Sequence, residues 1–292
     1  MTFDTFIIQL TNGLVFSLLL FLMAAGLSLI FGLMEVVNLA HGTFYLLGGY
    51  VGLTIVSWLG NFWLALLIAP LSVGALGLLL EITLLRRLYR RGHLDQVLFT
   101  FGVALIGADL MRWAWGAYVL TISTPPLLAG QVDVMGIAFP VYRLTMIALG
   151  LLIAGLLWLV IERTRIGAIV RAGVSDAQMV GGLGINIERV FAGVFAVGCG
   201  LAALSGVAAA PIVNLYPGLD FEILILAMVV VVVGGLGTLK GAFWGSLLIG
   251  MADTFGKSSQ LAQFSSFVIF VIMGLVLLIK PAGLFGRDRT LG

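Results

Sequence analysis

The feature that most constrains the fold is a series of long apolar runs that fill almost all of the 292 residues. Each run has about 17 to 25 residues, which is enough for an α-helix to cross the hydrocarbon core of a bilayer. Hydrophobic residues make up 61% of the sequence and charged residues only 10%, so no polar segment is large enough for a soluble catalytic domain. The runs do not alternate as the strands of a membrane β-barrel do. The sequence therefore predicts an all-α polytopic membrane protein with one domain, residues 1–292.

The apolar pattern predicts eight or nine transmembrane or re-entrant helices. The seventh and eighth segments are joined only by Thr238, Leu239 and Lys240, so they form either two full spans or one re-entrant hairpin. The predicted segments are 10–34, 43–60, 62–85, 97–115, 142–161, 189–212, 221–238, 241–256 and 264–280.

Lysine and arginine are distributed unevenly over the predicted connections. If the N-terminus is outside, only Arg112, Arg143 and Lys257 of the 15 basic residues are external. The cytoplasmic set is Arg86, Arg87, Arg90, Arg91, Arg163, Arg165, Arg171, Arg189, Lys240, Lys280, Arg287 and Arg289. An excess of Lys and Arg marks cytoplasmic connections. The predicted topology therefore has the N-terminus outside and the C-terminus in the cytoplasm.

A polar break, Asn38–Gly42, separates the first two apolar runs. Polar groups at membrane depth are costly and usually face a cavity or the interior of a helix bundle. Transporters often break a helix where the freed backbone groups line a substrate path. Asn38, His41 and Gly42 are therefore candidates for a translocation path. A structural histidine that ties the first span to its neighbour is an equally good reading of His41, and Asn38 has the same two readings.

Two connections between the predicted spans are long. The external connection, about 116–140, contains Thr124–Pro126 and Gly130–Asp133 and is predicted to be an exposed loop with turns and little helix. The internal connection, about 162–188, is polar and compact. A short helix is predicted within it over 175–180, with Ser175 or Asp176 as the N-cap. Glycines that can end this helix follow at Gly181, Gly182 and Gly184.

This internal connection has the properties of a docking element. Ala177, Met179 and Val180 offer apolar contacts to a cytoplasmic partner, while Arg171 and Asp176 can fix its orientation through charge-assisted hydrogen bonds. The alternative is a solvated loop whose basic residues only enforce the topology. The residues alone favour neither interpretation.

The other notable polar residues have structural interpretations. Asp109 and Arg112 are three positions apart and are expected to form an ion pair on one helix face. Glu81, which precedes Arg86 by little more than a turn, is expected to reach a membrane interface. Asp253 is either a path residue or a packing residue. Cys199, the only cysteine, lies in an apolar run beside Gly198 and Gly200 and is expected to be a small packing residue rather than a redox or metal ligand.

The sequence contains no nucleotide-binding motif. A phosphate-binding loop has two glycines five positions apart before Lys and Ser or Thr, whereas Gly250 and Gly256 before Lys257 are six apart. We therefore expect no enzymatic activity, no catalytic residues, no metal site and no bound cofactor in this chain.

Four motifs occur in order along the chain. They are Asn38–Phe44 with Gly48 and Tyr50, the internal loop with Arg171, Ala172, Asp176 and Gly184–Asn186, the stretch Gly234–Ala242, and the terminal Pro281–Arg287. Together they resemble the permease subunits of branched-chain amino-acid ATP-binding-cassette (ABC) importers, of the LivH type, over nearly the whole chain. Gln178, where this family often has a charged residue, and Gly181 and Gly182 depart from its pattern.

The resemblance implies a permease subunit in a prokaryotic plasma (inner) membrane that forms half of a translocation path for leucine, isoleucine and valine. It implies a second homologous permease, two cytoplasmic ATPase subunits that use ATP, and an external binding protein. Its ATPase-coupling loop would include Arg171, Asp176, Ala177, Gln178, Gly184 and Asn186. The alternative is a permease, or a self-sufficient channel or ion-coupled transporter, for urea, short amides or another small neutral solute. Neither reading involves nucleic acid.

Overall fold

The structure is a computed structural model that describes residues 3–89, 91–134, 136–258, 262 and 265–286. Arg90, Arg287 and Arg289, counted above as cytoplasmic, and residue 264 of the last predicted span lie outside these residues. The main helices are α1 (Phe3–Met34), α2 (His41–Leu59), α3 (Phe62–Thr83), α4 (His93–Trp115), α5 (Val141–Arg163), α8 (Ile187–Ala209), α9 (Leu219–Gly234), α10 (Leu239–Ser258) and α11 (Ser265–Ile279). Each of the nine predicted segments corresponds to one of these helices, so the all-α prediction is confirmed.

Six of the described helices are long and apolar enough to cross a membrane on their own: α1 to α5 and α8. The pair α9 and α10 passes the same test only when the two helices are taken together, and it bends by 119° at the break between them. Helix α9 has 16 residues, so it is about 24 Å long and shorter than a bilayer core of about 30 Å. The chain is a multi-pass membrane protein in which α9 and α10 turn sharply on each other.

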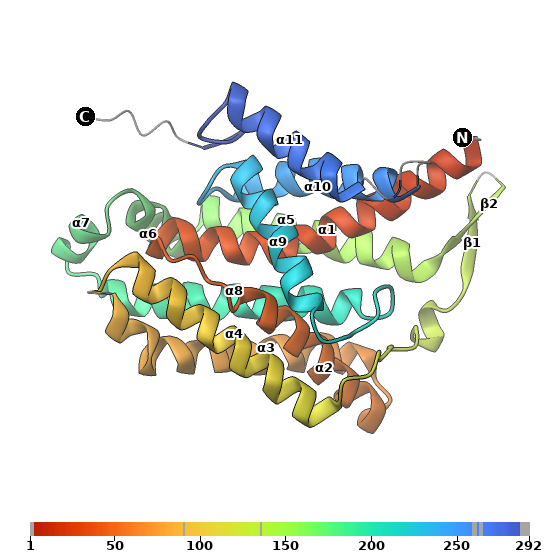
Figure 1. The fold of residues 1–292 in the computed structure, drawn as a ribbon, viewed down its shortest axis with the longest axis horizontal. Helices are drawn as coiled ribbons and strands as arrows, with labels where there is room; N and C mark the ends of the chain where they lie inside the picture. The colour runs from red at the N-terminus through yellow and green to blue at the C-terminus, as the bar shows by residue number, and fades with distance from the viewer. Residues whose placement is uncertain (1–2, 90, 135, 259–261, 263–264, 287–292) are drawn as a thin grey trace.

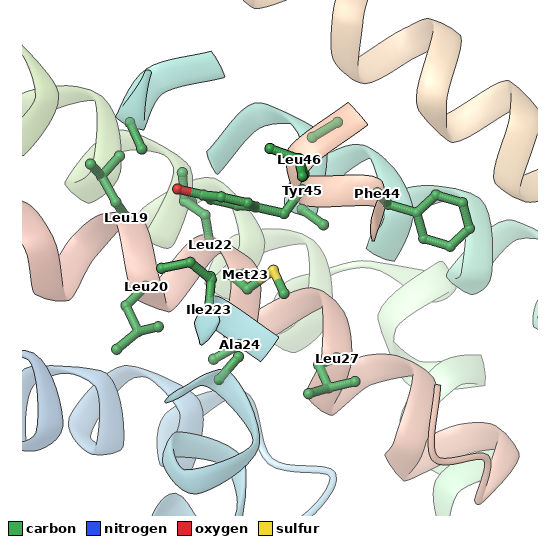
Figure 2. Close-up of a cluster of buried hydrophobic side chains, with 14 of the residues drawn as sticks. Leu19, Leu20, Leu22, Met23, Ala24, Leu27, Phe44, Tyr45, Leu46 and Ile223 are labelled. Atoms are coloured by element: carbon green, nitrogen blue, oxygen red, sulfur yellow. The ribbon is translucent and has the colours of Figure 1, made fainter. Parts of the chain in front are cut away.

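Helix α1 forms the centre of the bundle (Figure 1). Its 32 residues include 17 buried ones, and it packs against α5, α8, α9 and α10. At Gly26 a side chain would overlap the backbone of Gly198 in α8, so the two helices approach closely. Small residues permit such approaches in membranes, where dispersion contacts drive helix association. Figure 2 shows the core around Met23, where side chains of α1 meet those of α2 and α9.

The two long connections lie at opposite ends of the bundle (Figure 1). At one end, near the start of α1, the 116–140 connection contains a short 3₁₀ helix, η2 (Pro126–Leu128), and an antiparallel hairpin of β1 (Gln131–Val134) and β2 (Ile137–Pro140). At the other end, the 162–188 connection forms α6 (Arg165–Ser175) and α7 (Ala177–Gly182). The prediction of little helix in the first connection is confirmed, whereas neither the hairpin nor α6 was expected. Which end is external stays a prediction.

Candidate functional site

A non-helical linker, residues 35–40, connects α1 to α2, and the polar break Asn38–Gly42 comprises the end of this linker and the first two residues of α2. The linker begins at Glu35, whose φ of 54° lies in the left-handed region. The side chain of Asn38 stabilises the turn, because its Oδ1 accepts a hydrogen bond from the Ala40 amide at 3.1 Å. The Asn38 carbonyl accepts a second bond from the His41 amide at 3.2 Å. Asn38 is therefore part of the turn that starts α2.

His41 is fully buried and connects α2 to α1. Its Nε2 lies 3.1 Å from the Met23 carbonyl oxygen. A carbonyl only accepts, so Nε2 is the protonated nitrogen and donates. Nδ1 then faces the core as an acceptor, and it has no partner among the described residues. This geometry matches the structural reading of His41, and a role in transport remains a prediction.

Gly42 lies at a close contact between α2 and α9. A Cβ atom at this position would overlap the backbone carbonyl of Asp220 and would lie 3.0 Å from Leu224 Cβ. The glycine is therefore required for packing rather than for a special backbone angle. The sequence analysis missed Asp220, a buried carboxylate at the start of α9 without a hydrogen-bond partner among the described side chains. An acid directly before an apolar helix was the available signal.

The region around the break leaves several polar atoms unsatisfied. Besides His41 Nδ1, the buried atoms without a hydrogen bond to the described residues include Asn38 Nδ2, Thr43 Oγ1 and Tyr50 Oη. A small cavity of about 10 Å³ adjoins Asn38 and Thr100. A cavity of about 10–15 Å³ is the smallest that can hold a water molecule. The break is therefore buried but incompletely hydrogen-bonded.

A larger cavity, about 360 Å³, lies on the hairpin side of the break. Its walls come from α1, α2, α5, α8, α9, α10 and the segment after α8. Asp253, which the sequence left between two readings, lines this cavity, and its buried carboxylate is 2.7 Å from Lys257 Nζ. Arg143 lines the same cavity and hydrogen-bonds to Asn12 of α1. Polar side chains near the hairpin end of the bundle, which are far apart in the sequence, thus line one cavity.

At the opposite end, Glu81, Arg86 and Tyr89 form a group that we call the Glu81 cluster. Arg86 donates to both carboxylate oxygens, at 3.4 and 3.0 Å, and Tyr89 Oη donates to Glu81 at 2.6 Å. Glu81 is fully buried, so the expectation that it reaches an interface is wrong: the short 3₁₀ helix η1 (Leu85–Leu88) brings its partners back over the carboxylate. Burial, aided by the bond to Glu81, raises the pKa of Tyr89 and keeps the phenol protonated. Arg86 also reaches Glu188 of α8 at 3.5 Å.

The predicted coupling residues lie together in α6, α7 and the start of α8. Asp176, one of the two caps that the sequence offered, is the N-cap of α7, because its carboxylate accepts from the Met179 amide at 2.8 Å; the helix begins two residues later than predicted, and Ser175 belongs to α6. Asn186 caps α8 in the same way, through the Arg189 amide at 3.1 Å. The other coupling candidates are Arg171, which pairs with Glu162 at 3.6 Å, the half-buried Ala177, the exposed Gln178, and Gly184, whose φ is 84°.

An exposed apolar surface accompanies these caps. The side chains of Met179 and Leu183 are 65% and 75% exposed, whereas Val180 is buried. Docking of an ATPase on this surface stays a prediction.

Two of the motifs that carried the resemblance meet each other and α1. Gly237, in the turn between α9 and α10, is so close to Gly32 of α1 that a side chain at either glycine would overlap the backbone of the other. Ser28 of α1 also hydrogen-bonds to the Thr238 carbonyl at 3.3 Å. The terminal motif lies against the end of α9, because the Leu284 amide donates a hydrogen bond to the Val233 carbonyl at 2.8 Å. These glycine-rich segments thus lock α1, α9 and α10 together.

The arrangement of helices has a counterpart among solved structures. The structure titled PsaBC from Streptococcus pneumoniae in complex with Fab contains a chain that matches with a TM-score of 0.52 and 14% sequence identity. The match covers 94% of this chain and 92% of that chain. At this low identity the likeness shows the fold alone: a helical, polytopic membrane protein of the same architecture.

Residues 9–277 match the family described as branched-chain amino acid transport system / permease component, and the chain belongs to this family. It is 29% identical to the high-affinity branched-chain amino acid transport system permease protein BraD of Pseudomonas aeruginosa, over 97% of this chain and 96% of the relative. It is also 29% identical to the corresponding LivH of Escherichia coli K12, over 98% and 97%. A probable LivH of Methanocaldococcus jannaschii is 25% identical over 96% and 92%. The chain is therefore a permease component of a transport system in the inner membrane.

Proposed function

We propose that the chain forms half of a translocation path for the branched-chain amino acids leucine, isoleucine and valine. The observation that carries this proposal is the family match over residues 9–277, because it includes the polar break, the coupling region and the glycine-rich turn in one alignment. The relatives named above are all named for branched-chain amino acid transport. Urea or a short amide, transported without ATP, is the alternative that these relatives do not favour.

The proposed importer has four kinds of subunit. This permease pairs with a second, homologous permease, two cytoplasmic ATPases hydrolyse ATP, and an external protein delivers the amino acid. The chain itself hydrolyses nothing and binds no cofactor. The N-terminus and the hairpin face outward and α6 and α7 face the cytoplasm, an orientation supported by the excess of basic residues near α6 and α7.

In this proposal the ATPase docks on the surface of α6 and α7. Asp176 and Asn186 hold two helix starts in place, while Met179 and Leu183 offer apolar contacts. Docking movements reach the core through Arg86, which contacts both Glu188 beside the coupling region and Glu81 in α3. Asn38, His41 and Gly42 contribute to the path wall at the point where α2 starts within the bundle.

Affinity purification of the chain from its native membrane in mild detergent, followed by mass spectrometry, tests the composition. Two ATPases and a second permease are expected to co-purify. Recovery of the chain alone, or only with its own copies, would contradict the coupling assignment and favour the channel alternative. Reconstitution of the recovered complex with its binding protein then tests the substrate: ATP-dependent uptake of radiolabelled leucine is expected, and uptake of urea instead would overturn the proposal.

A further inference from the structure

The cavity of about 360 Å³ has an apolar inner wall and a charged rim. We propose that it binds one free amino acid with an aliphatic side chain, within a single permease protomer. The proposal rests on the proposed function, because it assigns that function's substrate class to a particular site. The volume falls within the range of about 300–1,000 Å³ that is typical of small-molecule sites.

The inner wall is built from core side chains. Leu19 and Leu20 of α1 and Ile223 of α9 line the cavity and are at least 93% buried. Figure 2 shows Tyr45 extending from α2 toward Leu19, and the buried Tyr45 is part of the inner wall of the cavity. An aliphatic side chain gains about 25 cal/mol per Å² of apolar surface that it removes from water in such a pocket. The inner wall therefore suits a branched hydrocarbon side chain.

The rim carries the charges that a zwitterion needs. Arg143 hydrogen-bonds to the neutral amide of Asn12, and no acidic residue in the described part of the chain forms an ion pair with it. A guanidinium can bind a carboxylate with two parallel hydrogen bonds. Arg143 thus has the free charge to hold the carboxylate of an amino acid.

The same rim also offers a negative group, Asp253 of α10. Lys257 lies 2.7 Å from Oδ2 of Asp253, and its ammonium is 5.8 Å from the centre of the Phe16 ring. No hydrogen bond from the described residues occupies Oδ1 of Asp253. An incoming α-ammonium group can therefore bind this oxygen while Lys257 keeps the other. The rim carries Arg143 and Lys257 against one carboxylate, so an anionic lipid headgroup is the competing occupant, but it would use only the positive groups, whereas a zwitterionic amino acid uses Arg143 and Asp253 together.

The position of the cavity connects it with the polar break. Arg143 lies in the first turn of α5, directly after the hairpin, so the charged rim is at the hairpin end of the bundle. Tyr45 and His41 are four residues apart on α2 and share one face of that helix. The inner end of the cavity is thus one helical turn from the predicted path residue His41. An amino acid delivered at the hairpin end would occupy this cavity before it reached the break.

Equilibrium binding of radiolabelled leucine to the complete transporter in nanodiscs, without the binding protein, tests the site. We expect saturable binding that isoamylamine, which lacks the carboxylate, and 4-methylvalerate, which lacks the ammonium, compete for poorly. Arg143→Gln and Asp253→Asn are each expected to weaken the binding at least tenfold. Arg112→Gln is the matched control, because Arg112 lies on α4 outside the cavity.

Two further measurements keep the outcome decisive. If Arg143→Gln fails to assemble, Ile212→Trp, which fills the cavity from its partly exposed wall, must still abolish the binding. The inference is overturned if the wild-type complex takes up leucine with its binding protein but binds none directly, or if the variants bind leucine as the wild type does. Native mass spectrometry that finds a phospholipid lost in Arg143→Gln and not displaced by leucine would also overturn it. A complex that transports no branched-chain amino acid would refute the proposed function instead.

Discussion

Two buried polar regions of this permease are built differently. In the Glu81 cluster, the carboxylate accepts hydrogen bonds from Arg86 and Tyr89 on both of its oxygens. Around the break Asn38–Gly42, one atom of each polar side chain is bonded and another is not: Asn38 uses Oδ1 but not Nδ2, and His41 uses Nε2 but not Nδ1. Both regions lie in a chain whose surroundings are almost entirely apolar.

The difference separates a fixed structure from an adaptable one. A fully satisfied buried network is rigid, because every alternative arrangement loses hydrogen bonds. Where polar atoms have no partner, a rearrangement loses fewer hydrogen bonds. Water or a passing polar solute can bond to such atoms without first displacing a partner. The Glu81 cluster is therefore interpreted as a joint that transmits movement, and the break as a region that can accept new partners.

Replacing Glu81 by alanine should have the largest effect. The change leaves a void beside the Tyr89 hydroxyl and takes one partner from Arg86, which is partly exposed and keeps Glu188, so the cost lies at or below the low end of the about 3–5 kcal/mol for breaking a buried ion pair. We expect a clear fall in Tm and in the amount of assembled complex, measured by thermal unfolding in detergent and by quantitative blotting of membranes. Glu81→Gln, which keeps the shape and one acceptor, should lose less. An unchanged Tm in the alanine variant would contradict the description of the cluster as a rigid joint.

Replacing Gly42 by alanine should have the next largest effect. The added methyl group overlaps the Asp220 carbonyl, and overpacking of this kind costs about 1–3 kcal/mol. We expect a lower Tm and reduced uptake, because α2 and α9 must separate. Gly102→Ala is the matched control, since a Cβ atom there meets no atom within 4 Å. If the two variants had the same Tm and the same uptake, α2 and α9 could separate at little cost, and Gly42 would not be required for their packing.

The sequence predicted the helices well and their connections poorly. Long apolar runs report directly on membrane spans, which is why all nine predicted segments correspond to helices. The helix α6 and the hairpin were missed, because their short polar segments have no such pattern and depend on local caps. One of these is Thr164, whose hydroxyl accepts from the Gly167 amide at 3.2 Å.

The candidate site was only partly predictable for a different reason. The polar break could be found, since Asn38 and His41 stand out in an apolar sequence. The cavity could not, because Arg143, Asp253 and Asn12 lie on three helices that are far apart in the sequence. Only the packing of α5 and α10 against α1 and its neighbours brings these side chains to one space.

Replacing His41 by alanine tests whether the break does more than hold helices together. The lost bond to Met23 costs about 1 kcal/mol, so the complex should still assemble. We expect transport to fall while the amount of complex in the membrane is maintained, measured as initial leucine uptake per assembled transporter. If uptake per transporter is unchanged, His41 has a packing role only. The interpretation of the break as a region that accepts new partners during transport would then be wrong.

The smallest effect on stability is expected at Asp176, a polar group that is satisfied at the surface rather than in the core. Alanine removes the N-cap of α7, which costs about 1 kcal/mol, and should weaken ATPase coupling more than membrane insertion. The ratio of leucine transported to ATP hydrolysed measures coupling, and blotting measures insertion. Asp176→Asn keeps the capping oxygen without the charge, so recovery of coupling in that variant would assign the requirement to the cap. Full coupled transport in the alanine variant would show that α7 is not the docking element, and the Glu81 cluster would then connect to a different cytoplasmic surface.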